Sequence, residues 1–262
     1  MTNIGSKKIT HIYQGDELLS TDNKETQTIT IGDKPMSFIY QGNELLYPNP
    51  VKNGLLLWYD FKSMKNSDLN KSVAIDLSGN GNNGTLQNFI YNNESGYNNG
   101  LQFDGVDDYY QTNNDIQRTS KLITICITAY MPDKATNWQY LLDLTDGNGK
   151  KISIIQQWGN PDVFINDLTN NNHNYFASNL EKYHLVFTLD GKNLKGYING
   201  ILTTPTGTNK IDINTFTNNL KITKPSSTRM KGTLYSLKVY DRILTDQEIQ
   251  QNYQLEKERW GL

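Results

Sequence analysis

The chain has 262 residues, with 25 basic and 27 acidic side chains and a formal net charge of -2. This length suits one large β domain with a small appendage, and the balanced charge argues against the basic surface of a nucleic-acid-binding protein. The 33 asparagines and 20 glycines favour turns over helices, and the 16 tyrosines favour strands. The composition therefore argues against a helical bundle and predicts many short strands.

The sequence carries no signal for membrane insertion or export. Its longest apolar runs fall far short of the roughly 20 residues that span a bilayer, and residues 1–13 lack the apolar stretch of a signal peptide. The single cysteine, Cys126, lies in the apolar run Leu122–Tyr130 and is expected to be a small buried side chain. We therefore expect a protein that is made in the cytoplasm and needs neither a disulfide nor a membrane.

The first 50 residues contain an internal repeat. Ile4–Leu19 and Ile31–Leu46 align at an offset of 27 positions and are identical at 10 of 16 positions. Each copy runs through Ile-Tyr-Gln-Gly into Glu-Leu-Leu, which predicts a short β-hairpin that turns at Gly15 in the first copy and at Gly42 in the second. Residues 1–50 are thus expected to form a duplicated hairpin module.

Two roles are open for this module. Because a two-stranded hairpin is marginally stable alone in water, the module could dock on a partner protein or on a second copy of the chain in a homo-oligomer. It could equally pack as a decoration on the main domain. The residues assigned to the anchoring hairpins are Tyr13, Gly15, Tyr40 and Gly42.

The rest of the chain shows the regular spacing of short strands that is typical of a β-sandwich or jelly roll. Thr245 and Glu248 form a capping box, which predicts a short helix over residues 246–258. We therefore expect a sandwich over residues 51–245 and a C-terminal helix and tail over 246–262. The expected strands are Leu55–Phe61, Leu122–Tyr130, Lys151–Gln156, Tyr183–Leu189, Leu194–Ile198, Ile201–Thr204 and Met230–Tyr240.

Three blocks of this region carry a resemblance to a known family. They are DLSGNGNNGTL at Asp76–Leu86, LQFDGVDDY at Leu101–Tyr109, and a tail that begins with YHLVF at Tyr183 and ends with VYDRILTDQEI at Ile249. In this order they resemble the laminin-G-like, concanavalin A-like jelly-roll domains of bacterial surface and phage proteins. The resemblance spans about Leu55–Tyr253 and implies an all-β, concanavalin A-like jelly-roll sandwich, preceded here by the duplicated hairpin module.

The N-terminal repeat carries a second, shorter resemblance. The pattern Ile-Tyr-x-Gly-x-x-Leu-Leu-Tyr-Pro at residues 39–48 is similar to short β modules of bacteriophage virion proteins. It implies a tail, baseplate or fibre protein that binds other virion proteins through the repeat. Synthesis in the host cytoplasm and release by lysis would bring such a domain outside the cell without a signal peptide.

The loop after residue 76 is a candidate calcium site. Asp76, Asn80 and Asn82 offer the oxygen ligands that calcium prefers, and the resembled family often binds calcium between this loop and the final strand. The corresponding strand segment here, Leu234–Leu237, has no carboxylate. A hydrogen-bonded loop without an ion is the alternative. The nearby Asp104, Asp107 and Asp108 could serve a site or a turn, and we favour the turn.

The sequence gives no pattern for catalysis. Glucanases on related folds need two carboxylates on one strand face, yet the one close glutamate pair, Glu256 and Glu258, falls in the expected helix. His11, His173 and His184 are widely spaced and do not form a zinc motif. We therefore expect a protein that is not an enzyme, with a glycan-active enzyme as the less favoured alternative.

Sugar binding needs aromatic rings beside hydrogen-bonding groups, and several aromatic residues lie near Asn-rich segments. These residues could equally fill the core or a subunit interface. The leading hypothesis is a virion protein with a lectin-like domain that contacts glycan on the host cell wall, and the alternative is a virion protein without a ligand. The candidate glycan-binding residues are Trp138, Trp158, His173, Asn174, Tyr175 and Tyr110.

Overall fold

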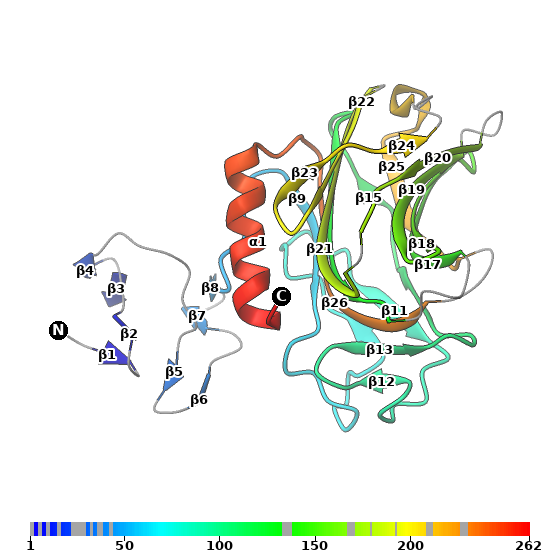
Figure 1. The fold of residues 1–262 in the computed structure, drawn as a ribbon. Coiled ribbons are helices and arrows are strands. Elements are labelled where there is room, and N and C mark those ends of the chain that lie inside the picture. Colours follow the sequence, from blue (N-terminus) through cyan, green and yellow to red (C-terminus); the bar gives the residue numbers. More distant parts are fainter. Residues whose placement is uncertain are drawn as a thin grey trace.

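The computed structural model describes residues 48–132, 138–166, 171–178, 180–191, 193–207, 212–225 and 230–262, and the backbone of eight short strands within residues 3–47. Two large antiparallel sheets face each other, and a C-terminal helix covers one of them (Figure 1). The chain is therefore nearly all β, as the sequence predicts. The described part contains no helix that is both long and apolar enough to cross a membrane.

One sheet, here called the helix-covered sheet, contains the long strands predicted from β-branched runs. Its strand order is β12-β13-β26-β16-β21-β22-β23, and β9 pairs with β26. The bounds are β12 Gly96–Tyr97, β13 Leu101–Asp104, β26 Lys231–Tyr240, β16 Ile123–Tyr130, β21 Lys182–Asp190, β22 Asn193–Ile198, β23 Ile201–Thr203 and β9 Leu55–Asp60.

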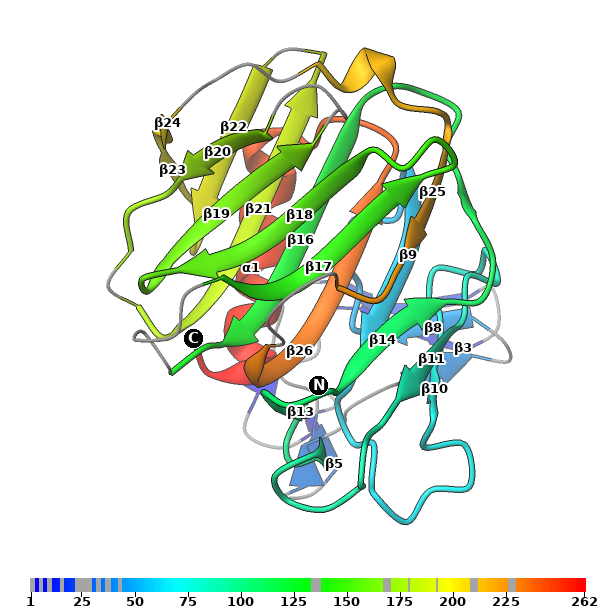
Figure 2. The ribbon, with the colours of Figure 1, turned by 90° about the vertical axis from the view of Figure 1, so that its right-hand side faces the viewer.

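The other sheet, here called the open sheet, has the order β15-β25-β17-β18-β19-β20-β24. Figure 2 looks onto its outer face, with α1 behind. Its strands are β15 Ile116–Gln117, β25 Asn219–Ile222, β17 Gln139–Asp146, β18 Lys151–Gln157, β19 Asn160–Asn166, β20 Asn171–Tyr175 and β24 Thr206–Gly207. A third, small sheet joins β10 Val73–Ala74, β11 Gly84–Gln87 and β14 Tyr109–Thr112, and a 3-10 turn, η1, spans Ile213–Thr215.

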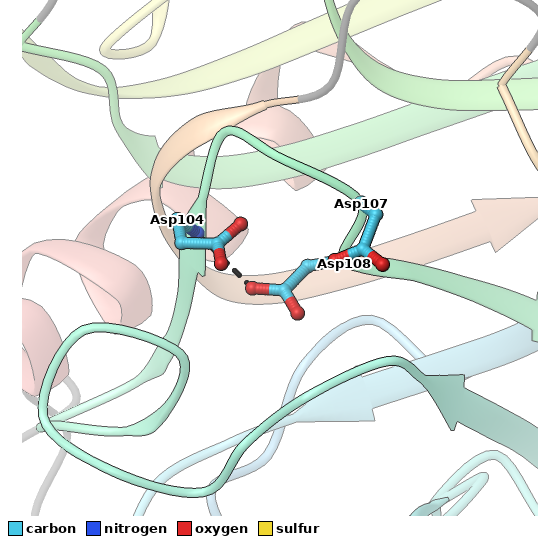
Figure 3. A group of neighbouring side chains, drawn as sticks. All are labelled: Asp104, Asp107 and Asp108. Atoms are coloured by element: carbon cyan, nitrogen blue, oxygen red, sulfur yellow. Dashed lines mark hydrogen bonds between the residues drawn. The ribbon is translucent and has the colours of Figure 1, made fainter.

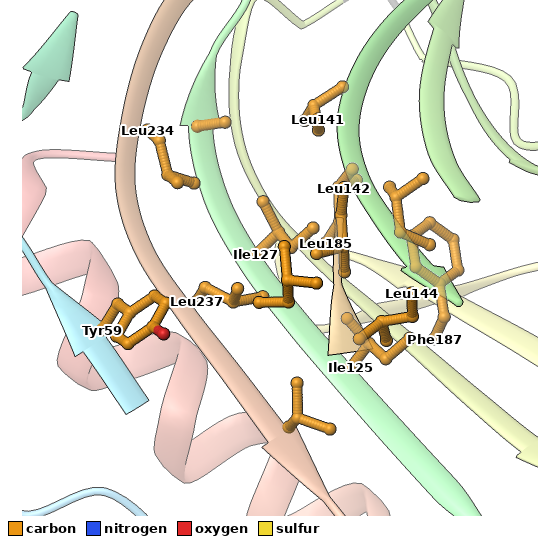
Figure 4. Packing of buried hydrophobic residues seen from close by; sticks show 14 of the residues in the cluster. Tyr59, Ile125, Ile127, Leu141, Leu142, Leu144, Leu185, Phe187, Leu234 and Leu237 are labelled. Atoms are coloured by element: carbon orange, nitrogen blue, oxygen red, sulfur yellow. The ribbon is translucent and has the colours of Figure 1, made fainter. Parts of the chain in front are cut away.

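The hydrophobic core lies between the two large sheets (Figure 4). Alternate residues of each strand point inward, so that Ile125 and Leu185 of the helix-covered sheet pack toward Leu142 and Leu144 of the open sheet. All four are at most 1 % exposed. This alternation fixes which residues of β17 to β20 must face away from the core.

The outer face of the helix-covered sheet is closed by α1, which spans Asp246–Trp260. Thr245 caps its N-terminus with the predicted capping box, and the helix ends two residues later than expected, at Trp260 before Gly261. Ile249 packs in a second apolar cluster with Cys126. Burial raises the pKa of the Cys126 thiol to about 12, which fits the expected inert cysteine.

A buried ion pair also joins α1 to the sheet. Lys238 of β26 bonds to Glu256 of α1, and the second Glu256 oxygen accepts hydrogen bonds from Thr128 (2.9 Å) and Ser236 (2.8 Å). Burial alone would raise the pKa of Glu256, but the charges of Lys238 and His184 and the hydrogen bonds from Lys238 and Ser236 lower it to about 2. Helix α1 therefore covers the outer face of this sheet over β16, β21 and β26.

The N-terminal repeat forms the predicted hairpins, β3 His11–Gln14 with β4 Glu17–Thr21, and β7 Ile39–Gln41 with β8 Glu44–Tyr47. Tyr13 and Tyr40 lie on these strands, while Gly15 and Gly42 lie outside the described residues. The ladder register shifts between Ile12 and Tyr13, and again between Ile39 and Tyr40, 27 residues later. The duplication thus extends to the position of a β-bulge.

Each copy also contains a second hairpin that we did not predict. These pairs are β1 Asn3–Ile4 with β2 Lys7–Lys8, and β5 Thr30–Ile31 with β6 Lys34–Pro35. They again stand at the same offset of 27 residues, so the repeat unit is two hairpins and not one.

Candidate functional site

Four ring side chains gather on the outer face of the open sheet. Phe164 of β19 pairs in register with His173 of β20, and Trp138 immediately precedes β17. The His173 ring centroid lies 4.6 Å from that of Phe164, 4.8 Å from that of Trp138 and 5.7 Å from that of Tyr175, which stacks on it at 10°. All four rings are half-buried. Trp138, Phe164, His173 and Tyr175 are called the aromatic face below.

The polar centre of the aromatic face is an aspartate beneath the histidine. His173 Nδ1 lies 2.6 Å from Asp162 Oδ2, and the backbone N–H of Asn174 donates to Asp162 Oδ1 at 2.8 Å. The Asp162 carboxylate is fully buried, whereas 21 % of the His173 side chain is exposed. Burial raises the pKa of Asp162, and the hydrogen bonds from His173 and Asn174 oppose this rise. The pair therefore holds the imidazole in one orientation.

Further polar groups continue across the same face toward β17. Strand pairing sets Asp143, Ser153, Phe164 and His173 in one row. The buried Asp143 carboxylate lies 3.8 Å from Lys151 Nζ, and the buried Ser153 hydroxyl has no hydrogen-bond partner among the described residues. The face thus has partly exposed rings at one end and buried polar groups at the other.

The structure places the other predicted glycan residues differently. Asn174 points inward, fully buried, and its amide donates to the Val163 carbonyl. Trp158 lies at the tip of the β18–β19 hairpin and is 63 % exposed. The φ angles of Trp158 (48°) and Gly159 (79°) are both positive, as in a type I′ turn.

The prediction of a surface role for Tyr110 needs correction. Tyr110 is 5 % exposed and packs in the core between the sheets, where its hydroxyl donates to the Leu141 carbonyl at 2.7 Å. The hydroxyl finds its partner inside the protein, which allows the whole ring to be buried.

The loop predicted as a calcium site is held by hydrogen bonds. Asp76 Oδ1 accepts from the N–H groups of Trp58 and Ser78, and Oδ2 accepts from the Ser78 hydroxyl and the Asn82 N–H, at 2.8 to 2.9 Å. The amide of Asn82 and that of Asn80 donate to backbone carbonyls of β9. A cation would have to displace these donors from Asp76, so the three residues do not fit a calcium ion as they stand.

Asp104, Asp107 and Asp108, at the turn between β13 and β14, form a compact acidic group (Figure 3). One carboxylate oxygen from each of these aspartates lies within 4.8 Å of the other two. Asp108 accepts hydrogen bonds from Ser95 and from the Asp104 N–H, and Asp104 accepts from the Val106 N–H. Burial, helped by the charges of Asp104 and Asp107, raises the pKa of Asp108 to about 6. Hydrogen bonds of this kind shape a turn, which is the role favoured for these aspartates from the sequence.

Comparison with known proteins assigns the fold. The sequence pattern of the "Concanavalin A-like lectin/glucanases superfamily" matches residues 104–250, more than half of the chain. The chain belongs to this superfamily. No curated protein sequence matches it.

Two solved structures share this superfamily fold with the chain. The sialidase of Trypanosoma rangeli is similar at a TM-score of 0.54 with 17 % identity, over 78 % of this chain and 33 % of its own. Domain 4 of AbnA, an extracellular arabinanase from Geobacillus stearothermophilus solved with arabinotriose, is similar at 0.52 with 20 % identity, over 76 % of this chain and 98 % of that domain. The chain thus spans about a third of the sialidase, and at these identities the likeness shows the fold alone.

Three of the four aromatic-face residues of this lectin/glucanase-like domain were predicted from the sequence. Phe164, the fourth, and the buried Asp162 were not predicted. Both lie in Asn160–Asn166, which begins with Asn-Pro and was not recognised as a strand. The available signal was their spacing, since residues two apart in a strand share a face.

Proposed function

We propose that this protein is a non-enzymatic, lectin-like protein that binds glycan on the aromatic face. The observation that carries the proposal is the gathering of Trp138, Phe164, His173 and Tyr175 on the outer face of the open sheet. Exposed ring surface can stack on the apolar faces of sugar rings, and adjacent polar groups can bond to hydroxyls. The rings offer the first kind of contact, and the partly exposed side chains of His173 and Lys151 offer the second.

The layering of the domain supports the choice of this face. The outer side of the helix-covered sheet is closed by α1, whereas the rings on the open sheet keep part of their surface in solvent. The core aromatics that could have served as alternatives, such as Tyr59 and Tyr110, are buried. A ligand can thus reach the aromatic face without any rearrangement of the core.

The similar structures add circumstantial support. The AbnA domain is described in complex with arabinotriose, and the sialidase with sialic acid analogues. Both are carbohydrate-related proteins that use this fold, and a glycan ligand for the present chain is consistent with that. Because both proteins have low sequence identity to this chain, the position proposed for the ligand rests on this chain's own residues.

We propose binding without hydrolysis. Asp143 and Asp162 are two carboxylates on the same face, which makes glycoside cleavage the second candidate. Asp162, however, already accepts hydrogen bonds at both oxygens, from His173 and from Asn174. Incubation with a broad polysaccharide panel tests this point, and release of reducing ends that Asp143→Asn abolishes would favour the enzyme.

The setting we propose is a bacteriophage virion, as a tail, baseplate or fibre component. The duplicated hairpins, whose bulges fall at equivalent positions, would bind other virion proteins or a second copy of the chain. The sandwich would then present the aromatic face to glycan of the host cell wall. Co-assembly of the full chain, but not of a chain with an altered repeat, with purified virion components would support this setting.

The experiment for glycan binding is a pull-down on insoluble polysaccharides and bacterial cell walls. Trp138→Ala and Tyr175→Ala are compared with Leu69→Ala, which alters a fully exposed apolar side chain outside the aromatic face. We expect the first two variants to lose retention and the third to behave as wild type. Retention by none of the matrices would favour the virion protein without a ligand.

A further inference from the structure

The Asp162–His173 pair bears on which glycan the aromatic face accepts, an inference that rests on the proposed function. We infer that the pair makes this face selective for neutral glycans over acidic ones. Two properties of the pair carry the inference: the position of the imidazole proton and the charge beneath the rings.

The position of the proton follows from the buried carboxylate. Asp162 accepts a backbone N–H from Asn174 at Oδ1, which favours its ionised form. An ionised Asp162 at 2.6 Å from His173 requires a proton on Nδ1. In the neutral imidazole this leaves Nε2 with a lone pair and no proton. Nε2 therefore accepts a hydrogen bond, which a sugar hydroxyl can donate and a sugar carboxylate cannot.

The surroundings of Nε2 favour a sugar ring. His173 is packed among Trp138, Phe164 and Tyr175 at centroid distances between 4.6 and 5.7 Å. No described group donates to or accepts from Nε2. A pyranose that stacks on the exposed rings would bring its hydroxyls to the edge of the imidazole.

The charge of the face disfavours an acidic sugar. The ionisable groups on the described strands of this face are Asp143, Lys151, Asp162, His173, the tyrosines Tyr140 and Tyr175, and Lys221 of β25, which stands in the row of Lys151 near the edge of the sheet away from the rings. Lys151 faces Asp143 at 3.8 Å and lies in the row beyond the rings. Burial is the main cause of the raised pKa of Tyr140, and the charges of Asp143 and Asp162 add to it. Both carboxylates therefore act on the same region of the face. A uronic or sialic carboxylate stacked on the rings would lie beside the Asp162 charge, with Lys151 and Lys221 in the row beyond.

The test uses matched probes that differ at C6 alone: β-1,4-mannan against β-1,4-mannuronan oligosaccharides, and β-1,4-glucan against β-1,4-glucuronan oligosaccharides. Affinities are measured by calorimetry at pH 8, where imidazoles are commonly neutral. We expect the full-length protein to bind at least one neutral probe roughly tenfold or more tightly than its acidic counterpart, as expected for one mismatched buried hydrogen bond.

The decisive variant is Asp162→Asn. Its amide can still accept from the Asn174 N–H while donating to Nδ1, which moves the imidazole proton to Nε2 and removes one negative charge. We expect neutral affinity to fall and acidic affinity to rise, so that the selectivity drops roughly tenfold. Imidazole ¹⁵N chemical shifts of wild type should show protonated Nδ1, and those of the variant protonated Nε2. The wild-type spectrum keeps the inference testable if the variant does not fold.

Failure of the inference and failure of the proposed function give different results. If Trp138→Ala leaves all binding unchanged, or if no probe binds, the aromatic face is not a glycan site. If Trp138→Ala abolishes binding but wild type treats neutral and acidic probes alike, or carries its imidazole proton on Nε2, the inference about Asp162 is wrong. Leu69→Ala serves as the matched surface control in each series.

Discussion

Replacing His184 by phenylalanine should remove a large part of the acid sensitivity of this fold. His184 lies on β21 beneath α1, fully buried, and neither ring nitrogen has a hydrogen-bond partner in the described structure. Its ring stacks on that of Tyr253 of α1 at 6.2 Å and 19°. Burial lowers the pKa of His184 from 6.5 to about 4; the charge of Lys238 adds to this and that of Glu256 opposes it.

The size of the effect follows from these two pKa values. Between pH 6.5 and pH 4 the unfolded chain binds a proton that the folded protein refuses, so folding stability is lost as the pH falls through this window. The gap corresponds to roughly 3 kcal/mol, fully lost near pH 4 and fully present above pH 7. Because mesophilic domains commonly have about 5–15 kcal/mol of stability in total, such a loss is easily measured.

The assay is urea unfolding of wild type and His184→Phe at pH 7.5 and at pH 4.5. Phenylalanine keeps a planar ring against Tyr253 and leaves no buried nitrogen without a partner, so the variant should be at least as stable as wild type at pH 7.5. On acidification the variant should lose about 2–3 kcal/mol less than wild type.

The comparison between the two proteins is needed because other groups titrate in the same range. Asp108, whose pKa is raised to about 6, acts in the opposite sense: its burial favours the protonated form, so its contribution to stability is lost as the pH rises. That contribution cancels between wild type and variant. An equal loss of stability in both proteins would refute the reasoning about His184.

Three further predictions concern the packing of the domain. Lys238→Met should destabilise the fold by about 3–5 kcal/mol because it leaves the Glu256 charge buried and unpaired, and adding Glu256→Leu should restore much of the loss in chemical denaturation. Gly196→Ala should destabilise by at least about 1–3 kcal/mol, since a Cβ there would come within 2.0 Å of the Phe176 ring, and an unchanged Tm would contradict the packing described. Asp76→Ala should lower the Tm because it removes an acceptor of four hydrogen bonds. EDTA should leave the wild-type Tm unchanged. A fall in Tm with EDTA that calcium reverses would show that the loop is held by an ion and not by these hydrogen bonds alone.

The strands of the helix-covered sheet could be predicted from sequence because their apolar, β-branched runs are continuous. β16 and β21 are buried on both faces, by the core and by α1, so apolar residues occupy both faces and the few polar residues inside the runs, Thr124, Thr128, His184 and Thr188, are themselves buried. The C-terminal helix was equally clear, because the Thr245 capping box is a local signal. These elements depend on short-range patterns that sequence alone displays.

Apart from β18, which was expected over Lys151–Gln156, the open sheet could not be predicted in the same way. β20 reads Asn-Asn-His-Asn-Tyr, a composition typical of a loop, and becomes a strand because it pairs with β19 and β24. β17 has a register shift between Tyr140 and Leu142 that breaks its alternation. Long-range pairing, which no local pattern records, decides both elements.

The same limit explains the mixed outcome for the site. Trp138, His173 and Tyr175 could be named because sugar binding needs aromatic rings beside hydrogen-bonding groups, but their meeting on one face depends on the register of β19 against β20. That register also brings Asp162 under His173. Tyr110 met the same sequence criterion and is nonetheless buried, because its hydroxyl reaches the Leu141 carbonyl.

The most direct test of the account is retention of the full-length protein on polysaccharides and bacterial cell walls, with Trp138→Ala and Tyr175→Ala beside Leu69→Ala. We expect wild type and Leu69→Ala to be retained by at least one matrix, and both ring variants, with unchanged Tm, to be released. Retention that survives the loss of both rings would contradict the assignment of glycan binding to the aromatic face.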